Sequence, residues 1–275
     1  MPSLPTRTLF TQLVDDAAVF PPGNFSLSEA IDRRSARRGT PASDFVGPLL
    51  LPPRLIDEAL EDHSGLVITV VGRRETPLDE VIAAAENVAD AAGHALSGLE
   101  VAAVDGWEKA LDLSVPVAVE VPAGAAGRDL LPGIADHEGQ VIAKLRTGST
   151  PANDVPSVPD TAAFITECVQ LGIAFKLTGG LHRAIAHTAG DHATGAEEQY
   201  GFLGILLAVQ AALLGGDVSA ALTDRDETSV TDAIRAMSEA DAMTVRNVFT
   251  SFGCCDVFDP IHDLAALGLI PERNA

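Results

Sequence analysis

Two lysines in short apolar segments are the residues of this sequence best suited to chemistry. The chain has 18 basic residues, and its only lysines are Lys109, Lys144 and Lys176. Lys144 lies in the apolar run 141–146 and Lys176 in the run 173–178. Buried charged residues are rare, and a buried lysine changes its pKa readily whereas an arginine does not. The pattern therefore indicates amine chemistry, unless both side chains merely extend from a strand end to water.

The segment 140–183 is predicted to be a strand, a helix and a second, parallel strand. Both apolar runs are followed by glycine, and 160–171 has the length and pattern of a crossover helix. Residues two apart in a strand share a face, so Lys144 lies on the same face as Arg146, and Lys176 on the same face as Thr178. If both faces point inward, the cations converge at the carboxyl ends of the strands, where α/β folds place their chemistry.

Lysine becomes a nucleophile when burial or a neighbouring cation lowers its pKa. We therefore predict that Lys144 forms an imine with a carbonyl compound and that Lys176 activates it. A carbon–carbon bond next to the original carbonyl could then break or form through an enamine, a step that needs a proton shuttle. Asp16 and Glu100, near the ends of early strands, are the candidates. Ordinary ion pairing with the lysines is the alternative role for both.

Apolar runs separated by turn residues predict eight strands that alternate with helices. The expected strands are 13–20, 46–51, 66–71, 98–104, 115–121, 141–146, 173–178 and 252–255. This alternation predicts an α/β fold of the (β/α)8 TIM-barrel type, with residues 1–275 forming a single domain. A doubly wound open sheet is the alternative. We expect a polar loop at 182–199, which could be a lid or a connector, an irregular excursion at 217–229, and a helix at 230–248.

The motifs around the two lysines resemble those of the class I, Schiff-base-forming aldolases, and most of all the deoxyribose-phosphate aldolase branch. Lys144-Leu-Arg-Thr147-Gly148 is similar to the lysine-x-x-threonine-glycine around that family's imine-forming lysine. The segment 175–180, Phe-Lys-Leu-Thr-Gly-Gly, is similar to the motif around its second, activating lysine. More weakly, 13–16 resembles the opening of the family's first strand and 251–255 its eighth strand.

The resemblance implies a lyase that acts through a lysine Schiff base, but the sequence departs from the family in two places. The family's proton-relay aspartate would fall near Glu100, which has a longer side chain. Its lysine on strand five has no counterpart in segment 116–120. The substrate and the proton route could therefore differ from the family's even if the imine chemistry is retained.

Glycines at strand ends suggest an anion site near the lysines. Backbone N–H groups at Gly179, Gly180 and Gly253 could bind a phosphate or carboxylate, although such glycines also serve simple turns. The other predicted substrate contacts are Arg146, Thr147, Thr178, His182 and Cys254, with additional charge from Arg183. The expected partner is a small carbonyl compound that carries an anionic or phosphorylated group.

The sequence predicts neither a metal nor a cofactor. His182, His187 and His192 recur every five residues, which does not align them on one helix face. Cys254 and Cys255 could supply a thiol nucleophile, but no paired histidine motif accompanies them. We therefore expect both cysteines to be small buried residues.

Composition limits the partners and the location of the protein. A formal net charge of -21 argues against binding to nucleic acid or to anionic membranes. The longest apolar stretch, 202–214, is too short to span a bilayer, the first residues lack a signal-peptide pattern, and the cysteines do not form a disulfide framework. A cytoplasmic protein is expected, and a homo-oligomer is left open.

Two other functions are compatible with the same sequence. A barrel isomerase or lyase could use lysine as a general base or electrophile without a covalent intermediate. A catalytically inactive barrel could bind a metabolite or a protein. The fold alone does not choose among these functions, because barrels host many chemistries.

Overall fold

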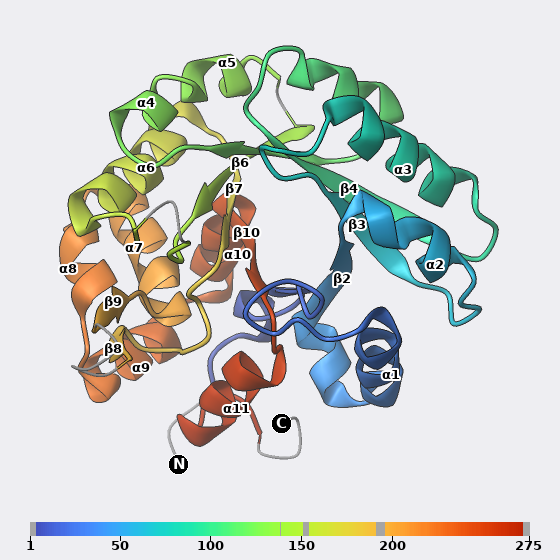
Figure 1. Ribbon diagram of the computed structural model, residues 1–275. Helices are drawn as coiled ribbons and strands as arrows, with labels where there is room; N and C mark the ends of the chain where they lie inside the picture. Colours follow the sequence, from blue (N-terminus) through green and yellow to red (C-terminus); the bar gives the residue numbers. More distant parts are fainter. Residues whose placement is uncertain (1–3, 138, 151–153, 191–195, 272–275) are drawn as a thin grey trace.

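Eight parallel strands close into a barrel in the computed structural model, which describes residues 4–137, 139–150, 154–190 and 196–271 (Figure 1). The strand order around the barrel is β1-β10-β7-β6-β5-β4-β3-β2, and β1 pairs with both β10 and β2. The predicted (β/α)8 fold is therefore confirmed. The alternative of an open, doubly wound sheet is wrong, because no edge strand remains in the barrel.

The barrel strands are short and are buried on both faces. They are β1 Val14–Asp16, β2 Val46–Leu51, β3 Val67–Val71, β4 Ala95–Ala102, β5 Val117–Val121, β6 Val141–Arg146, β7 Phe175–Thr178 and β10 Phe249–Cys254. Near-continuous apolar runs are typical of parallel strands that are covered by helices. Charged residues inside such strands are therefore unusual and need a specific explanation.

Helices cover the outside of the barrel (Figure 1). The α-helices are α1 Leu27–Arg37, α2 Ile56–Leu60, α3 Leu78–Asp90, α4 Ala125–Arg128, α5 Leu131–Ala135, α6 Val158–Leu171, α7 Phe202–Leu214, α8 Val218–Thr223, α9 Glu227–Ala236, α10 Glu239–Val248 and α11 Phe258–Ala266. Short 3-10 helices are η1 Arg7–Leu9, η2 Pro41–Phe45, η3 Pro53–Leu55 and η4 Trp107–Leu113. None of the helices in the described ranges combines the length and apolar character needed to cross a membrane.

The crossover helix α6 sets the relative position of the two lysine strands. Ser157 caps its first turn by accepting a hydrogen bond from the Asp160 N–H at 3.2 Å. Gly172 ends the helix with φ at 69°, a left-handed conformation that glycine adopts at low cost. The chain then enters β7, where Lys176 lies directly beside Lys144 of β6 in the parallel register.

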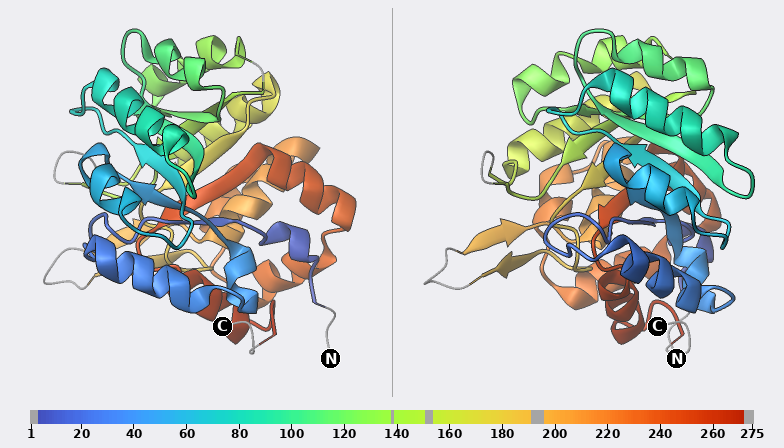
Figure 2. Two further views of the ribbon diagram at one scale, coloured as in Figure 1. Left: turned by 90° about the vertical axis from the view of Figure 1, so that its right-hand side faces the viewer. Right: turned by 45° about the vertical axis from the view of Figure 1, so that its right-hand side comes forward.

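Three expectations about the second half of the chain need correction. The segment 182–199 contains a short antiparallel pair, β8 His187–Ala189 and β9 Glu197–Gln199, which projects from the barrel in the right-hand view of Figure 2. Strands of three residues are too short to show an alternating pattern. Residues 191–195 of the expected lid or connector, which include His192, lie outside the described residues.

The remaining two differences concern helices. The expected excursion at 217–229 contains α8 and the start of α9, and the single helix expected at 230–248 is divided between α9 and α10 at Met237 and Ser238. Ser238 forms a capping box with Asp241 and so begins α10. Strand β10 starts at Phe249, directly after α10, with no glycine or proline to mark the boundary in the sequence.

Candidate active site

A row of five charged side chains crosses the inside of the barrel near the carboxyl ends of its strands. Parallel register aligns Glu120 of β5 with Lys144 of β6, Lys144 with Lys176 of β7, and Lys176 with Ser251 of β10. Residues in register on neighbouring strands point to the same face, so these four side chains all face the barrel interior.

Carboxylates and ammonium groups alternate along this row. Lys144 Nζ lies 2.6 Å from Glu120 Oε2 and 2.7 Å from Glu100 Oε2. Lys176 Nζ lies 2.5 Å from Glu100 Oε1 and also donates to Asp15, which belongs to β1. The row therefore runs Glu120, Lys144, Glu100, Lys176, Asp15, and Glu100 bridges the two lysines.

The row ends differently on its two sides. At one end, Asp15 accepts a second hydrogen bond from Ser251 Oγ at 2.7 Å, and its side chain is 4% exposed. At the other end, Glu120 Oε1 lies 3.5 Å from Arg146 Nε, and the Glu120 side chain is 26% exposed. Between them, Lys144 and Glu100 are almost completely buried. Water therefore reaches the row at Glu120.

The network shifts the ionisation of its members in defined directions. Burial opposes the charged form of Glu100, but Lys144 and Lys176 outweigh it and lower the pKa of Glu100 from 4.5 to about 2. Burial alone would lower the pKa of Lys176, but Asp15 and Glu100 outweigh burial and raise it. For Glu120, burial is likewise outweighed by Lys144 and Arg146, so its pKa is lowered. Lys176 is thus a stable ammonium.

A small cavity of about 60 Å³ opens above this row. Its walls come from residues at the carboxyl ends of the strands and the loops after them: Ala17, Phe20, Pro21, Pro22, Leu50, Val71, Arg73, Glu100, Lys144, Arg146, Thr178, Gly179, Gly180, His182, Gly253 and Cys255. Lys144 lines the cavity, whereas Lys176 does not. Of the two strand lysines, Lys144 is the one that a small molecule in the cavity would meet.

Most of the predicted site residues come together around this cavity, and three of the predicted substrate contacts have other surroundings. Thr147 is buried, and its Oγ1 donates to the Gly179 carbonyl at 2.8 Å, which ties the β6 and β7 loops together. The Cys254 thiol is buried and donates to the Asp256 carbonyl at 3.1 Å, while the neighbouring Cys255 lines the cavity. Arg183 extends to Asp263 at 2.8 Å.

Asp16 does not join the lysines, and Asp15 takes the place predicted for it. Consecutive residues of a strand point to opposite faces, so Asp15 faces the barrel interior and Asp16 faces α1. There, Asp16 pairs with Arg37 and lies 3.8 Å from Arg34. Burial outweighs both arginines and raises the pKa of Asp16. Asp16 therefore lies away from the cavity, and the prediction that it serves there as the proton shuttle is wrong.

The predicted glycines form a tight backbone corner at the cavity wall. Gly179 and Gly180 have φ of 78° and 75°, in the left-handed region. A Cβ added at Gly148 would lie 2.7 Å from the Gly179 carbonyl carbon and 2.8 Å from the Gly180 nitrogen. The β6 and β7 loops can therefore meet only as bare backbone, next to the charged groups of Arg146 and Arg73.

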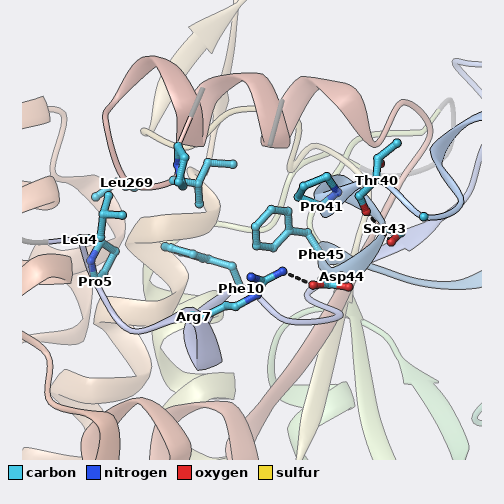
Figure 3. A pocket seen from close by; sticks show the side chains of 13 residues that line it. Leu4, Pro5, Arg7, Phe10, Thr40, Pro41, Ser43, Asp44, Phe45 and Leu269 are labelled. Atoms are coloured by element: carbon cyan, nitrogen blue, oxygen red, sulfur yellow. Dashed lines mark hydrogen bonds and ion pairs between the residues drawn. The ribbon is translucent and has the colours of Figure 1, made fainter. Parts of the chain in front are cut away.

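Larger cavities lie elsewhere and lack a comparable set of reactive groups. One of about 600 Å³ is lined by the segments that precede β1 and β2, together with Leu269, Ile270 and Pro271 (Figure 3). Its two charged residues, Arg7 and Asp44, are paired with each other. Another, of about 740 Å³, lies beside the β8–β9 pair, where Arg225 is paired with Glu198. In the described part of the chain, no group of three or more His, Cys, Asp or Glu residues is arranged to hold a metal ion.

Sequence comparison adds no further assignment. No protein-family model matches this chain, and a search of curated proteins finds no match. The fold and the site geometry therefore define a (β/α)8 barrel with a buried lysine–carboxylate row beneath a small cavity. The resemblance to class I aldolases stays a prediction.

Proposed function

We propose that this protein is a class I aldolase-like lyase in which Lys144 forms a Schiff base with a small carbonyl compound. The observation that carries the proposal is that Lys144 lines the cavity, whereas Lys176 does not line it and is bound to Asp15 and Glu100. Barrel enzymes place their chemistry at this end of the strands. A cavity of about 60 Å³ favours a substrate whose reacting part is small.

The first step is the addition of Lys144 to the substrate carbonyl. The amine must be neutral to attack, so the ammonium first gives a proton to Glu120, whose Oε2 lies 2.6 Å away. Nζ then adds to the carbonyl carbon, and loss of water gives the protonated imine. Glu120 can exchange its proton with solvent because it is the most exposed carboxylate of the row.

The protonated imine accepts the electron pair of the carbon–carbon bond that breaks and becomes an enamine. Lys176 contributes a fixed positive charge, since Asp15 and Glu100 raise its pKa and keep it protonated. That charge also keeps Glu100 ionised, in position to stabilise the iminium at Lys144. An anionic group on the substrate would lie near Arg146, Arg73 and the backbone at Gly179 and Gly180.

Borohydride trapping tests the proposal. The protein is incubated with glycolaldehyde, acetaldehyde or dihydroxyacetone, reduced, and mapped by mass spectrometry. We expect one reduced adduct at Lys144, which disappears in Lys144→Ala and is weakened in Lys176→Met. Lys109→Met is the matched control, because Lys109 is exposed and its nearest charged partner, Asp79, is 3.9 Å away. An adduct yield at Lys144 no higher than at Lys109 would exclude the covalent mechanism.

One observation favours a non-covalent alternative. Lys144 Nζ donates to two carboxylates, an arrangement that also suits an ammonium that polarises a substrate carbonyl while Glu120 abstracts the adjacent proton. The Lys144→Arg variant separates the two mechanisms, because arginine keeps a donor and cannot form the imine. Deuterium exchange next to the substrate carbonyl should be lost in this variant if the imine is required and retained if it is not.

A further inference from the structure

A histidine, two adjacent cysteines and an aspartate meet beside the barrel cavity, outside the lysine row. His182 follows β7, and its Nε2 lies 3.5 Å from Cys255 Sγ. Its Nδ1 lies 2.9 Å from Asp259 Oδ2 of α11 and 3.6 Å from Cys254 Sγ. His182 and Cys255 both line the cavity that Lys144 reaches.

This arrangement has the three parts of an activated nucleophile. Cys255 supplies the nucleophilic atom, one ring nitrogen of His182 contacts it, and Asp259 binds the other ring nitrogen and fixes the orientation of the ring. We propose that Cys255 is a second nucleophile of the cavity, held as a thiolate by His182 and Asp259, and that it adds reversibly to the carbonyl group of small aldehydes.

The two adjacent cysteines have different environments. Cys254 is 1% exposed and donates its S–H to the Asp256 carbonyl, and burial raises the pKa of its thiol. Cys255 is 8% exposed and faces the cavity. The remaining cysteine, Cys168, is buried in α6, and burial raises its pKa as well. Cys255 is therefore the cysteine that combines access with an ionising partner.

Contacts around His182 favour its imidazolium form. The contacts with Cys254 and Cys255 raise the pKa of His182, burial opposes this, and Asp259 adds to the increase. Other charged groups that line the cavity are Arg73, Arg146, Lys144 and Glu100, and Asp256 next to Cys255 is paired with Arg33 at 2.7 Å. Reactive cysteines occur beside such cationic groups, and His182 Nε2 lies 3.5 Å from the Cys255 sulfur.

The proposed addition is balanced within the site. The Cys255 sulfur forms a bond to the aldehyde carbon, and the electron pair of the C=O π bond moves to the oxygen. The imidazolium of His182 gives its proton to that oxygen, which yields a thiohemiacetal and a neutral imidazole. Neither an oxidant nor a reductant is needed, and the reverse steps release the aldehyde. The reaction does not depend on the imine at Lys144.

Alkylation kinetics test the thiolate. The rate of carbamidomethylation by iodoacetamide is followed at each cysteine by peptide mapping between pH 5.5 and 9. We expect Cys255 to react fastest and to keep most of its rate at pH 6. His182→Gln should slow Cys255 at pH 6 by about tenfold or more, with the rates converging near pH 9. Asp259→Asn should have a smaller effect, and Cys254→Ser should change the Cys255 rate by less than about twofold.

Competition with an aldehyde tests the addition, and it is carried out in the Lys144→Ala variant so that imine formation cannot contribute. Acetaldehyde should slow alkylation of Cys255 in proportion to its concentration, and the rate should recover after dialysis.

A Cys255 rate at pH 6 that is no higher than that of the urea-unfolded chain, or that is unchanged in both His182→Gln and Asp259→Asn, would overturn the proposal that Cys255 is held as a thiolate. Fast alkylation of Cys255 at pH 6 that acetaldehyde does not slow would overturn the proposed addition to aldehydes. All of these outcomes are independent of whether borohydride traps Lys144.

Discussion

Two clusters of buried charge lie on opposite sides of strand β1 and differ in composition. Inside the barrel, Asp15 begins a row that contains two lysines and meets the cavity at Glu100 and Lys144. Outside, Asp16 is held by Arg37 and Arg34 against α1. Arginine remains charged under all ordinary conditions, whereas the proton of lysine can be moved by its surroundings. The charges on the outer side of the strand are therefore fixed, whereas those on the inner side include protons that the surroundings can move.

The largest change in stability is expected at the buried lysine of the inner cluster. Lys176→Met leaves three carboxylates with one remaining lysine, so we expect the free energy of unfolding at pH 7 to fall by about 3–5 kcal/mol. Urea unfolding measures this difference. Lys109→Met, at an exposed position, should change the free energy by no more than about 0.5 kcal/mol. A Lys176→Met protein as stable as the wild type would mean that the inner charges are not held as the structure describes.

Breaking the outer cluster should lower stability without changing the chemistry. Arg37→Met leaves Asp16 with Arg34 at 3.8 Å, so we expect a loss of about 2–3 kcal/mol. The yield of the borohydride adduct at Lys144, measured under conditions where the variant is folded, should match the wild type. Loss of the adduct in the folded variant would show that the two clusters are coupled across β1.

The two clusters should respond to acid with opposite sign. The pKa of Glu100 is lowered to about 2, so the unfolded chain protonates first and the Glu100 contribution, about 3 kcal/mol, is lost as the pH falls from about 4.5 to 2. The pKa of Asp16 is raised above 3.8, so the folded chain protonates first and the Asp16 contribution increases as the pH falls. Unfolding free energies of Glu100→Gln and Asp16→Asn between pH 3 and 7, each subtracted from the wild-type value, should therefore have opposite slopes. Slopes of the same sign would remove the distinction between the clusters.

The smallest change in stability is expected at the open end of the inner row. Glu120 is 26% exposed, so Glu120→Gln should change the free energy of unfolding by no more than about 1 kcal/mol. The rate at which the trapped imine appears should nevertheless fall about 10²-fold, because the proton acceptor for Lys144 is removed. Equal imine rates in Glu120→Gln and wild type would assign the proton transfer to another group.

The sequence allowed the barrel and one half of the site to be predicted, because both depend on local patterns. Strand β6 was expected at the residues where it occurs, since its apolar run and following glycine are unambiguous, and the pairing of Lys144 with Lys176 follows from the β-α-β unit. Strand β1 was expected to run from 13 to 20, whereas it covers only Val14–Asp16. The choice between Asp15 and Asp16 depends on which face of that short strand turns inward, and only the pairing with β10 and β2 determines it.

Other members of the site could not be found from local sequence. Glu120 lies in the segment 116–120, which the sequence marked only as lacking a counterpart of a family lysine, and its place in the row follows from its register with Lys144. His182 and Cys255 are 73 positions apart, on two loops that meet only because β7 and β10 are neighbours in the closed barrel. Adjacent cysteines without a nearby histidine in the sequence therefore gave no sign of the contact.

The unequal ends of the inner row also set how protons travel through it. Asp15 and Lys176 do not line the cavity, so a hydrogen on the Lys176 nitrogen leaves by way of Glu100, from which it reaches Lys144 and Glu120. The row is closed to water at Asp15 and open to it at Glu120. In heavy water, the ammonium hydrogens of Lys176 should therefore be replaced after those of Lys144, and a molecule that fills the cavity beside Lys144 and Glu100 should delay both.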